Sequence, residues 1–235
     1  MVWDVQYGLT SLVEGSCAVA AAAGYTVTMG SVYSHAEEIE SLDNFIRNRA
    51  KGVVIAPRAY SAADHYRELV SRKIEVVLID TLIPGIEEDN VLIDNAHGTS
   101  LSASYLWGLG HRNLCYIDYE GPHGDTYPIN NERCRGFMET CALAGLPGDR
   151  FKVIVTNNTN YSSEIQQILT GPNRPTALIT YNDLVAVRAI QVAEQLGLRV
   201  PKDLSVIGFD DSIIASNFNV PLTTINPERY EMGAA

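Results

Sequence analysis

The chain has 235 residues, of which 46% are hydrophobic and 19% charged, and its formal net charge is −11. This is the composition of a soluble globular protein with one large domain or two smaller ones. No run approaches the roughly 18 apolar residues of a membrane span, and the N-terminus lacks the features of a secretory signal. We therefore expect a cytoplasmic protein that is too acidic to bind duplex DNA by itself.

Short β-branched runs alternate with longer segments that can form helices. The predicted strands are 26–29, 53–56, 76–79, 91–93, 114–117, 153–155, 177–179 and 205–207. The predicted helices are 8–23, 34–49, 62–72, 98–109, 131–144, 162–169 and 183–196, and another begins near 227. Runs this short and apolar suit parallel strands that are buried on both faces. Repeated strand–helix–strand units predict a doubly wound α/β fold with parallel sheets.

Glycines and serines mark several helix ends. Gly110, Gly145 and Gly197 each follow a helical segment, where a left-handed residue ends a helix. Ser34 or Ser61 can cap the helix that follows it. The four cysteines form no C-x-x-C pair, so we expect free and mostly buried thiols.

Four blocks near the C-terminus stand in a distinctive order and spacing. They are RPTALITYNDLVA (174–186), LRVPKDLSVIGFDD (198–211), PLTTI (221–225) and YEMG (230–233). Together they resemble the regulatory domain of the lactose/galactose-repressor (LacI/GalR) family. Further blocks agree with it: KGVVIAP (51–57), VLIDN (91–95), LGHR (109–112) and RCRGF (133–137). The resemblance covers residues 5 to 235.

The resemblance implies a periplasmic-binding-protein-like type I fold, with two Rossmann-like lobes and a cleft between them. Residues 1–94 with 226–235 would form the N-terminal lobe, and residues 95–225 the C-terminal lobe. The family's helix-turn-helix headpiece is absent from this sequence, which fits the acidic charge. The resemblance also implies a homodimer, with Phe218 either in its interface or in the core, and operator DNA bound through the headpiece.

Polar residues that follow strands are the candidates for binding a ligand, because ligands of open parallel sheets lie beyond the carboxyl ends of the strands. Asp80 follows one predicted strand and could accept hydrogen bonds from ligand hydroxyls or serve as a turn or cap residue. The resemblance favours the ligand for Asp80. Asp94 follows another strand, where the chain crosses between the lobes. It either contacts the ligand or only stabilises the hinge at this crossing.

The second lobe supplies three more candidates, and the resemblance favours a ligand contact for each. Arg133 offers five donors in a fixed fork, suited to vicinal hydroxyls or a carboxylate, although a surface salt bridge is the more common role of an arginine. Asn182 can donate and accept, and we expect Asp183 to cap the next helix in its place. Asp210 is assigned to the ligand and Asp211 to local structure, since no third carboxylate suggests a metal. Arg135 is expected to be structural or solvated.

Aromatic side chains give sugar rings a flat apolar surface. Trp3, Tyr7 and Tyr127 are candidates for that role, with ordinary packing as the alternative. Two segments depart from the family pattern: Asn226-Pro227 follows the PLTTI block, and residues 156–161 align poorly. Both departures leave the identity of the effector open.

No enzyme motif stands out: a nucleophile elbow, a P-loop, G-x-G-x-x-G and H-E-x-x-H are all missing from the sequence. We therefore predict a non-enzymatic effector-sensing domain of a transcription regulator, which binds a sugar or similar polar metabolite without a cofactor or metal. The alternative is a periplasmic sugar-binding protein of a transport system. From the sequence, we expect that replacing Arg133 or Asp210 with alanine abolishes effector binding and leaves thermal unfolding nearly unchanged.

Overall fold

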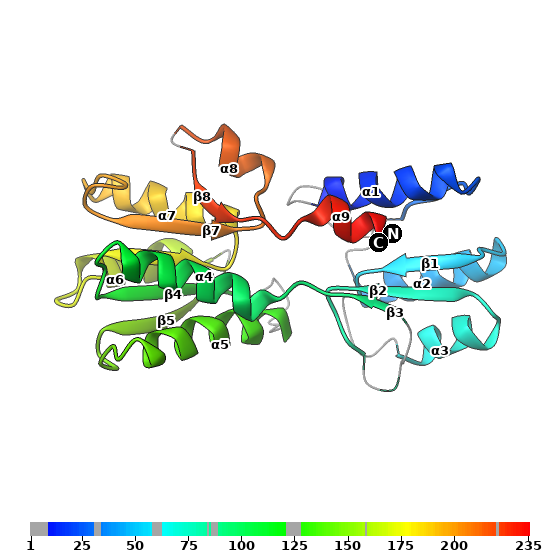
Figure 1. The fold of residues 1–235 in the computed structure, drawn as a ribbon, viewed down its shortest axis with the longest axis horizontal. Helices are drawn as coiled ribbons and strands as arrows, with labels where there is room; N and C mark the ends of the chain where they lie inside the picture. Colours follow the sequence, from blue (N-terminus) through cyan, green and yellow to red (C-terminus); the bar gives the residue numbers. More distant parts are fainter. Residues whose placement is uncertain are drawn as a thin grey trace. The chain divides into compact units, whose positions relative to one another are not determined.

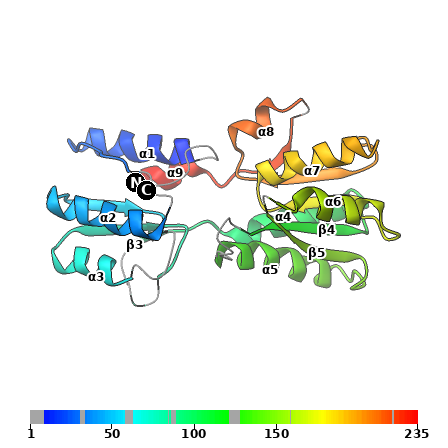
Figure 2. The same ribbon diagram turned by 180° about the vertical axis from the view of Figure 1, so that it is seen from behind.

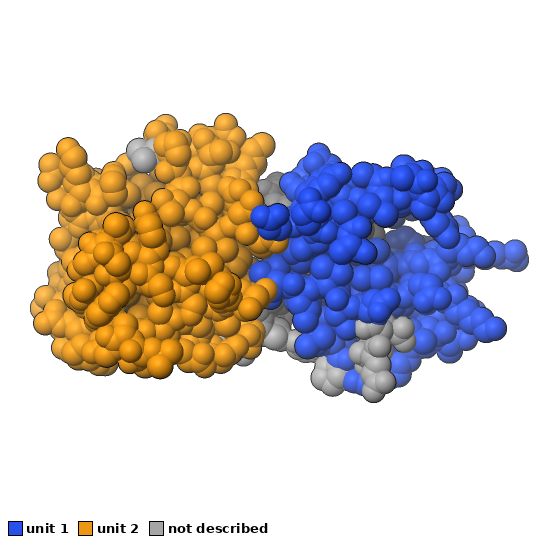
Figure 3. Space-filling model, viewed as in Figure 1, with its two compact units in different colours: residues 1–93, 228–235 blue, residues 94–227 orange. Residues whose placement is uncertain are grey.

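The computed structural model describes residues 9–30, 34–57, 63–83, 85, 89–120, 128–157, 159–219 and 221–235. The chain divides into two compact units, shown in separate colours in Figure 3. Unit 1 comprises Met1–Ile93 and Glu228–Ala235, and unit 2 comprises Asp94–Pro227. These boundaries lie one and two residues from the ones expected above.

Unit 2 is built on a five-stranded parallel sheet of order β5-β4-β6-β7-β8. Its strands are β4 (Leu114–Tyr119), β5 (Phe151–Thr156), β6 (Ala177–Thr180), β7 (Ser205–Phe209) and β8 (Thr223–Ile225). Its helices are α4 (Asn95–Gly108), α5 (Pro128–Leu143), α6 (Tyr161–Thr170), α7 (Asp183–Gln195) and α8 (Ile213–Asn217). Crossover helices between parallel strands are the doubly wound α/β arrangement that the sequence predicts, so the fold class is confirmed.

Helices cover both faces of this sheet (Figures 1 and 2). On one face, Tyr116 of β4, Ile179 of β6 and Ile207 of β7 pack against α4 and α5. On the other face, alternate residues of the same strands pack against α6 and α7. Burial on both faces explains why β4, β6 and β7 are mostly apolar.

Unit 1 has a parallel sheet of order β1-β2-β3 in the part that the structure describes. Its strands are β1 (Gly52–Ile55), β2 (Glu75–Ile79) and β3 (Asp89–Val91). Its helices are α1 (Leu9–Ala22), α2 (His35–Arg47), α3 (Ala63–Ser71) and α9 (Arg229–Ala234). Helices α2 and α3 pack on one face of the sheet, and α1 and α9 supply Leu12 and Met232 to the other.

Helix α9 belongs to unit 1 because it packs closely on α1, as Figures 1 and 2 both show. A Cβ atom at Gly15 would lie 2.1 Å from the Tyr230 carbonyl oxygen. A Cβ atom at Gly233 would lie 1.9 Å from the Leu12 carbonyl oxygen. Glycine at both positions therefore lets the two helix backbones touch, and this contact fixes the returning chain to unit 1.

The predicted strand at 26–29 is wrong. Residues 25–30 belong to no helix or strand, and Tyr25 and Met29 are exposed. A β-branched run forms a strand only where a neighbouring strand offers hydrogen bonds, and none of the described strands pairs with this run. The short elements α8 and β8 were not predicted, because β8 has three residues and none of them is fully buried.

The helix ends predicted at Ser34 and at three glycines agree with the structure. The Ser34 side chain accepts a hydrogen bond from the Glu37 amide. Gly110, Gly145 and Gly197 all have positive φ angles, at 93°, 71° and 79°. Ser61 lies outside the described residues. Of the cysteines, Cys115 and Cys141 are buried and the other two are partly exposed.

Candidate functional site

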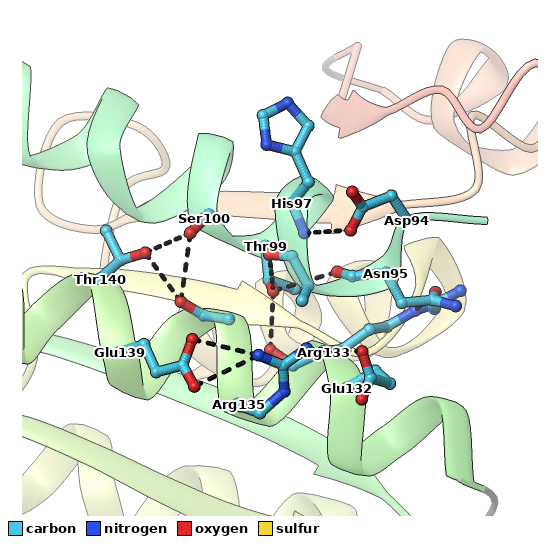
Figure 4. A network of polar contacts seen from close by, with 12 residues as sticks. Asp94, Asn95, His97, Thr99, Ser100, Glu132, Arg133, Arg135, Glu139 and Thr140 are labelled. Carbon is cyan, nitrogen blue, oxygen red and sulfur yellow. Dashed lines mark hydrogen bonds and ion pairs between the residues drawn. The ribbon is translucent and has the colours of Figure 1, made fainter.

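Arg133 lies in the first half of α5 and is buried, with 2% of its surface exposed. It contacts several polar groups of unit 2. Its Nε donates to Asn95 Oδ1 at 2.7 Å, and its Nη1 donates to the Tyr181 carbonyl oxygen at 2.5 Å. Figure 4 shows the side chain of Arg133 beside Asn95. The guanidinium also lies over the Phe209 ring, 3.7 Å from its centroid. A buried arginine with these contacts is held in one orientation.

Asp210 forms an ion pair with this arginine, with 3.5 Å between Arg133 Nη2 and Asp210 Oδ1. The two side chains are 3% and 9% exposed. Asp210 directly follows β7 and has a φ angle of 106°, which non-glycine residues rarely adopt. Two residues that were predicted separately as ligand contacts, Arg133 and Asp210, therefore meet at the carboxyl edge of the sheet. Arg135, by contrast, is exposed and pairs with Glu132 and Glu139, as predicted.

Buried Asp183 holds the segment that carries Asp210. Its carboxylate accepts hydrogen bonds from the amide and hydroxyl of Ser212, at 2.7 and 2.8 Å, and from the Thr224 hydroxyl. Burial raises the pKa of Asp183, and its hydrogen bonds lower that pKa by less. Asp183 thereby joins the start of α7 to the segment after β7 and to β8.

The assignment of the cap to Asp183 was wrong, because its neighbour Asn182 is the cap of α7. Asn182 Oδ1 accepts from the Val185 amide at 3.0 Å, and its backbone is extended. Asp183 instead points at Ser212 and Thr224. The cap occupies one acceptor position of the Asn182 side-chain oxygen. The predicted ligand contact would therefore have to use the remaining acceptor position or the side-chain NH2 group.

Asp94 also has a local role, at the start of α4. Asp94 Oδ1 accepts from the His97 amide at 2.9 Å, which caps the helix (Figure 4). The next residue, Asn95, is buried and receives the hydrogen bond of Arg133. Asp94 therefore caps α4, the helix whose Asn95 accepts the hydrogen bond of Arg133. The contact of Asp94 with a ligand stays a prediction.

Asp80, in unit 1, directly follows β2 and has a φ angle of 54°. Its amide donates to the Val91 carbonyl oxygen at 2.8 Å, and its Oδ1 accepts from the Ile93 amide at 3.4 Å. Its ligand contact remains a prediction. Trp3, Tyr7 and Tyr127 lie outside the described residues.

Phe218 packs partly buried against the core of unit 2, and its predicted dimer contact stays a prediction. Tyr119 and Tyr181 stack on each other, with ring centroids 6.2 Å apart, at the carboxyl edge. Among the described residues, no group of three His, Cys, Asp or Glu side chains could hold a metal ion.

One acidic residue near Arg133 was missed by the sequence analysis. Asp118 lies within β4, is 8% exposed, and its Oδ1 accepts from the Tyr119 amide at 2.9 Å. Burial raises the pKa of Asp118, while the Tyr119 amide and Arg133 lower it by less. The available signal was a carboxylate inside an otherwise apolar and aromatic strand.

The chain is similar to known regulators in sequence and in fold. Residues 103–235 match the family model described as periplasmic binding protein-like domain. The regulator DegA of Bacillus subtilis is 32% identical over 86% of this chain and 60% of its own length. The repressor CytR of Escherichia coli is 28% identical over 95% of this chain and 65% of its own length. The repressor PurR of Erwinia tasmaniensis is 31% identical over 94% of this chain and 64% of its own length.

Solved structures agree. A LacI transcriptional regulator from Rhodococcus superposes with a TM-score of 0.86 at 26% identity, covering 100% of this chain and 85% of that one. A LacI-family regulator from Enterococcus faecium, solved with bound ribose, has a TM-score of 0.83 at 22% identity, covering 99% and 85%.

The class defined by the fold and by these matches is the periplasmic-binding-protein-like domain. This chain belongs to that family, in the form found in LacI-family transcriptional regulators. It spans between 60 and 65% of the length of the curated relatives named above. Those relatives are transcription regulators by name, and none of the names describes an enzyme. No helix in the part of the chain that the structure describes is long and apolar enough to cross a membrane.

Proposed function

We propose that this chain is the effector-sensing part of a LacI-type transcription regulator and that it binds a small polar metabolite, a sugar or a related compound. The observation that carries the proposal is the buried Arg133–Asp210 pair at the carboxyl edge of unit 2. Ligands of open parallel sheets bind beyond this edge. The ribose bound by the Enterococcus faecium relative supports a sugar-like effector.

The chemistry of the pair suits hydroxyl groups. The guanidinium donates hydrogen bonds and the carboxylate accepts them, so together they can bind neighbouring hydroxyls of one ligand. Asn95 and the Tyr181 carbonyl hold the guanidinium in place before any ligand arrives. A preorganised group loses little conformational entropy on binding, which favours affinity. Asp80, Asp94 and Asn182 are proposed as further contacts.

Regulation would follow from a difference in affinity. An effector changes operator binding only if it binds two conformations of the regulator unequally. We propose that the protein acts in the cytoplasm as a homodimer, because a two-fold dimer matches a palindromic operator. DNA binding would belong to a separate headpiece, because this chain has a net charge of −11.

A thermal-shift screen tests the proposal. Sugars, sugar phosphates, nucleosides and small acids are each added to the purified chain, and the unfolding temperature is measured. A ligand at a hundredfold excess over its dissociation constant stabilises the folded state by about 2.7 kcal/mol. At least one neutral sugar or nucleoside should raise the unfolding temperature. Complete absence of stabilisation across the screen would contradict the proposal.

The alternative, a periplasmic sugar-binding protein, predicts ligand binding as well but no operator binding. The two are separated by gel shifts with the full-length natural protein and the DNA upstream of its gene. A regulator should bind that DNA with an affinity that falls with salt and changes with the effector. The present chain alone should show no such shift.

A further inference from the structure

Arg133 has a second acidic neighbour besides Asp210. We propose that Asp118, together with the buried Tyr116 hydroxyl, extends the effector site along β4 and makes it select an uncharged polyhydroxyl ligand over a phosphorylated or carboxylated one. This inference rests on the function proposed above and adds to it a specificity-determining residue and a ligand class.

Strand register brings Asp118 to the same face of the sheet as Arg133. Tyr116 of β4 is in register with Ile179 of β6, and Ile179 with Ile207 of β7. All three pack on the face covered by α4 and α5. Side chains two residues apart on a strand share a face, so Asp118 and Phe209 lie on this face too, one step nearer the carboxyl edge. The guanidinium of Arg133 lies over Phe209.

Electrostatic neighbours agree with this placement. The positive charge of Arg133 lowers the pKa values of both Asp118 and Tyr116, although burial raises each of them by more. Asp118 in turn raises the pKa of Cys134, the residue next to Arg133 in α5. Asp118 is therefore close in space to Arg133 and Cys134 of α5.

Asp118 and Tyr116 retain hydrogen-bonding capacity. A carboxylate has about four acceptor positions, yet in the described part of the chain the Asp118 carboxylate accepts one hydrogen bond, from the Tyr119 amide. The Tyr116 hydroxyl is fully buried and has no hydrogen-bond partner there. Buried phenol hydroxyls ordinarily have a partner, so this hydroxyl is suited to pair with a bound molecule.

The balance of charge decides the ligand class. Asp210 already pairs with Arg133, so a carboxylate at Asp118 gives the three side chains a net negative charge. An anionic ligand would meet like charge in a buried setting, where repulsion is strong. A ligand with hydroxyl groups can donate to Asp118 and to Asp210 and accept from Arg133.

Two matched ligand pairs test the inference: D-ribose with D-ribose 5-phosphate, and adenosine with adenosine 5′-monophosphate. Dissociation constants are measured by calorimetry for the wild type, Asp118→Asn, Tyr116→Phe and the control Asp211→Asn, which changes an exposed carboxylate beside Asp210. The neutral member of a pair should bind wild type at least tenfold more tightly than its phosphate. Asp118→Asn should weaken that binding about ten- to a hundredfold, the loss expected for a hydrogen bond to a charged group.

Tyr116→Phe distinguishes a direct role in ligand binding from an indirect effect of lost stability. Removing an unpaired buried hydroxyl should leave the free protein at least as stable, while the neutral ligand binds more weakly. The control Asp211→Asn should bind like the wild type.

Three results would overturn the inference: tighter binding of the phosphate, unchanged affinity in Asp118→Asn, or no binding of any of the four probes. In each case the wider screen still decides the proposed function, because an anionic or unrelated ligand found there would support an effector site without Asp118.

Discussion

Asp80 and Asp210 occupy matching positions in the two units. Each directly follows a strand, β2 or β7, and each has a positive φ angle, 54° and 106°. The amide of Asp80 donates to the carbonyl of Val91, the last residue of β3. The amide of Asp210 donates to the carbonyl of Ile225, the last residue of β8. A backbone strain that recurs at the same place in both sheets is typical of functional positions.

Asp80→Gly tests whether this strain is kept for function. Glycine adopts positive φ without steric cost, and relief of that cost, roughly 1 kcal/mol, offsets the loss of the weak hydrogen bond from Ile93. The free energy of unfolding should therefore stay within about 1 kcal/mol of wild type, while effector affinity falls. Denaturant unfolding and calorimetry measure the two quantities.

Lys73→Gly is the matched control, because Lys73 is exposed and has a φ angle of 60°. It should be at least as stable as the wild type and bind the effector normally. A strongly destabilised Asp80→Gly with normal affinity would instead mark Asp80 as structural.

Replacing Arg133 should cost stability as well as binding. The sequence alone suggested that Arg133→Ala would unfold like the wild type, but its burial at 2% exposure predicts otherwise. Alanine removes the cation that pairs with buried Asp210 and the side chain that donates to Asn95, which should cost about 3 to 5 kcal/mol. Chemical denaturation measures the loss. Arg135→Ala, at an exposed ion pair, should change stability by less than about 0.5 kcal/mol, and equal losses for both variants would contradict this view of Arg133.

Gly208→Ala should displace Asp183. A Cβ atom at residue 208 would lie 2.2 Å from Asp183 Oδ1. The carboxylate would have to move away from Ser212 and Thr224, at a cost of about 1 to 3 kcal/mol for unpaired buried groups. Gly148→Ala is the control, since a Cβ atom there meets nothing within 4 Å. Thermal unfolding should show a clear decrease for Gly208→Ala alone, and an unchanged unfolding temperature for both would show that the segment adapts.

Asp118→Asn should change the pH dependence of stability. Burial raises the pKa of Asp118 above its ordinary value of 3.8, so the folded state binds more protons than the unfolded state between the two pKa values. Wild-type stability should therefore fall as pH rises through this window. Asparagine can still accept from the Tyr119 amide and carries no buried charge. The stability of Asp118→Asn relative to wild type should then increase with pH, which unfolding at a series of pH values above 3.8 measures. A constant difference would contradict the raised pKa.

Much of the fold was predictable because burial leaves a direct trace in the sequence. Strands β1, β2, β4, β6 and β7 lie in buried layers and are mostly apolar runs. The run at 26–29 has the same composition but no described neighbour to pair with, so composition alone misassigned it. Strand pairing depends on residues far away in the chain, which local patterns do not contain.

The site was predictable in part for a similar reason. Arg133 and Asp210 were chosen as candidates from the resemblance and, for Asp210, from its place after a strand, and the structure brings them together as an ion pair. Their contact with an effector stays a prediction. The cap was assigned to Asp183 in place of Asn182 because both are good cap residues and only the backbone angles distinguish them. Asp118 was missed because the search considered residues after strands, whereas Asp118 lies within one.

The most direct test of the account is calorimetric titration of D-ribose and adenosine into the purified chain, with Asp210→Asn alongside. The account predicts that at least one of them binds the wild type at one site and that Asp210→Asn, still folded by circular dichroism, binds it at least tenfold more weakly. Equal binding by wild type and Asp210→Asn would show that the Arg133–Asp210 pair is not where the effector binds.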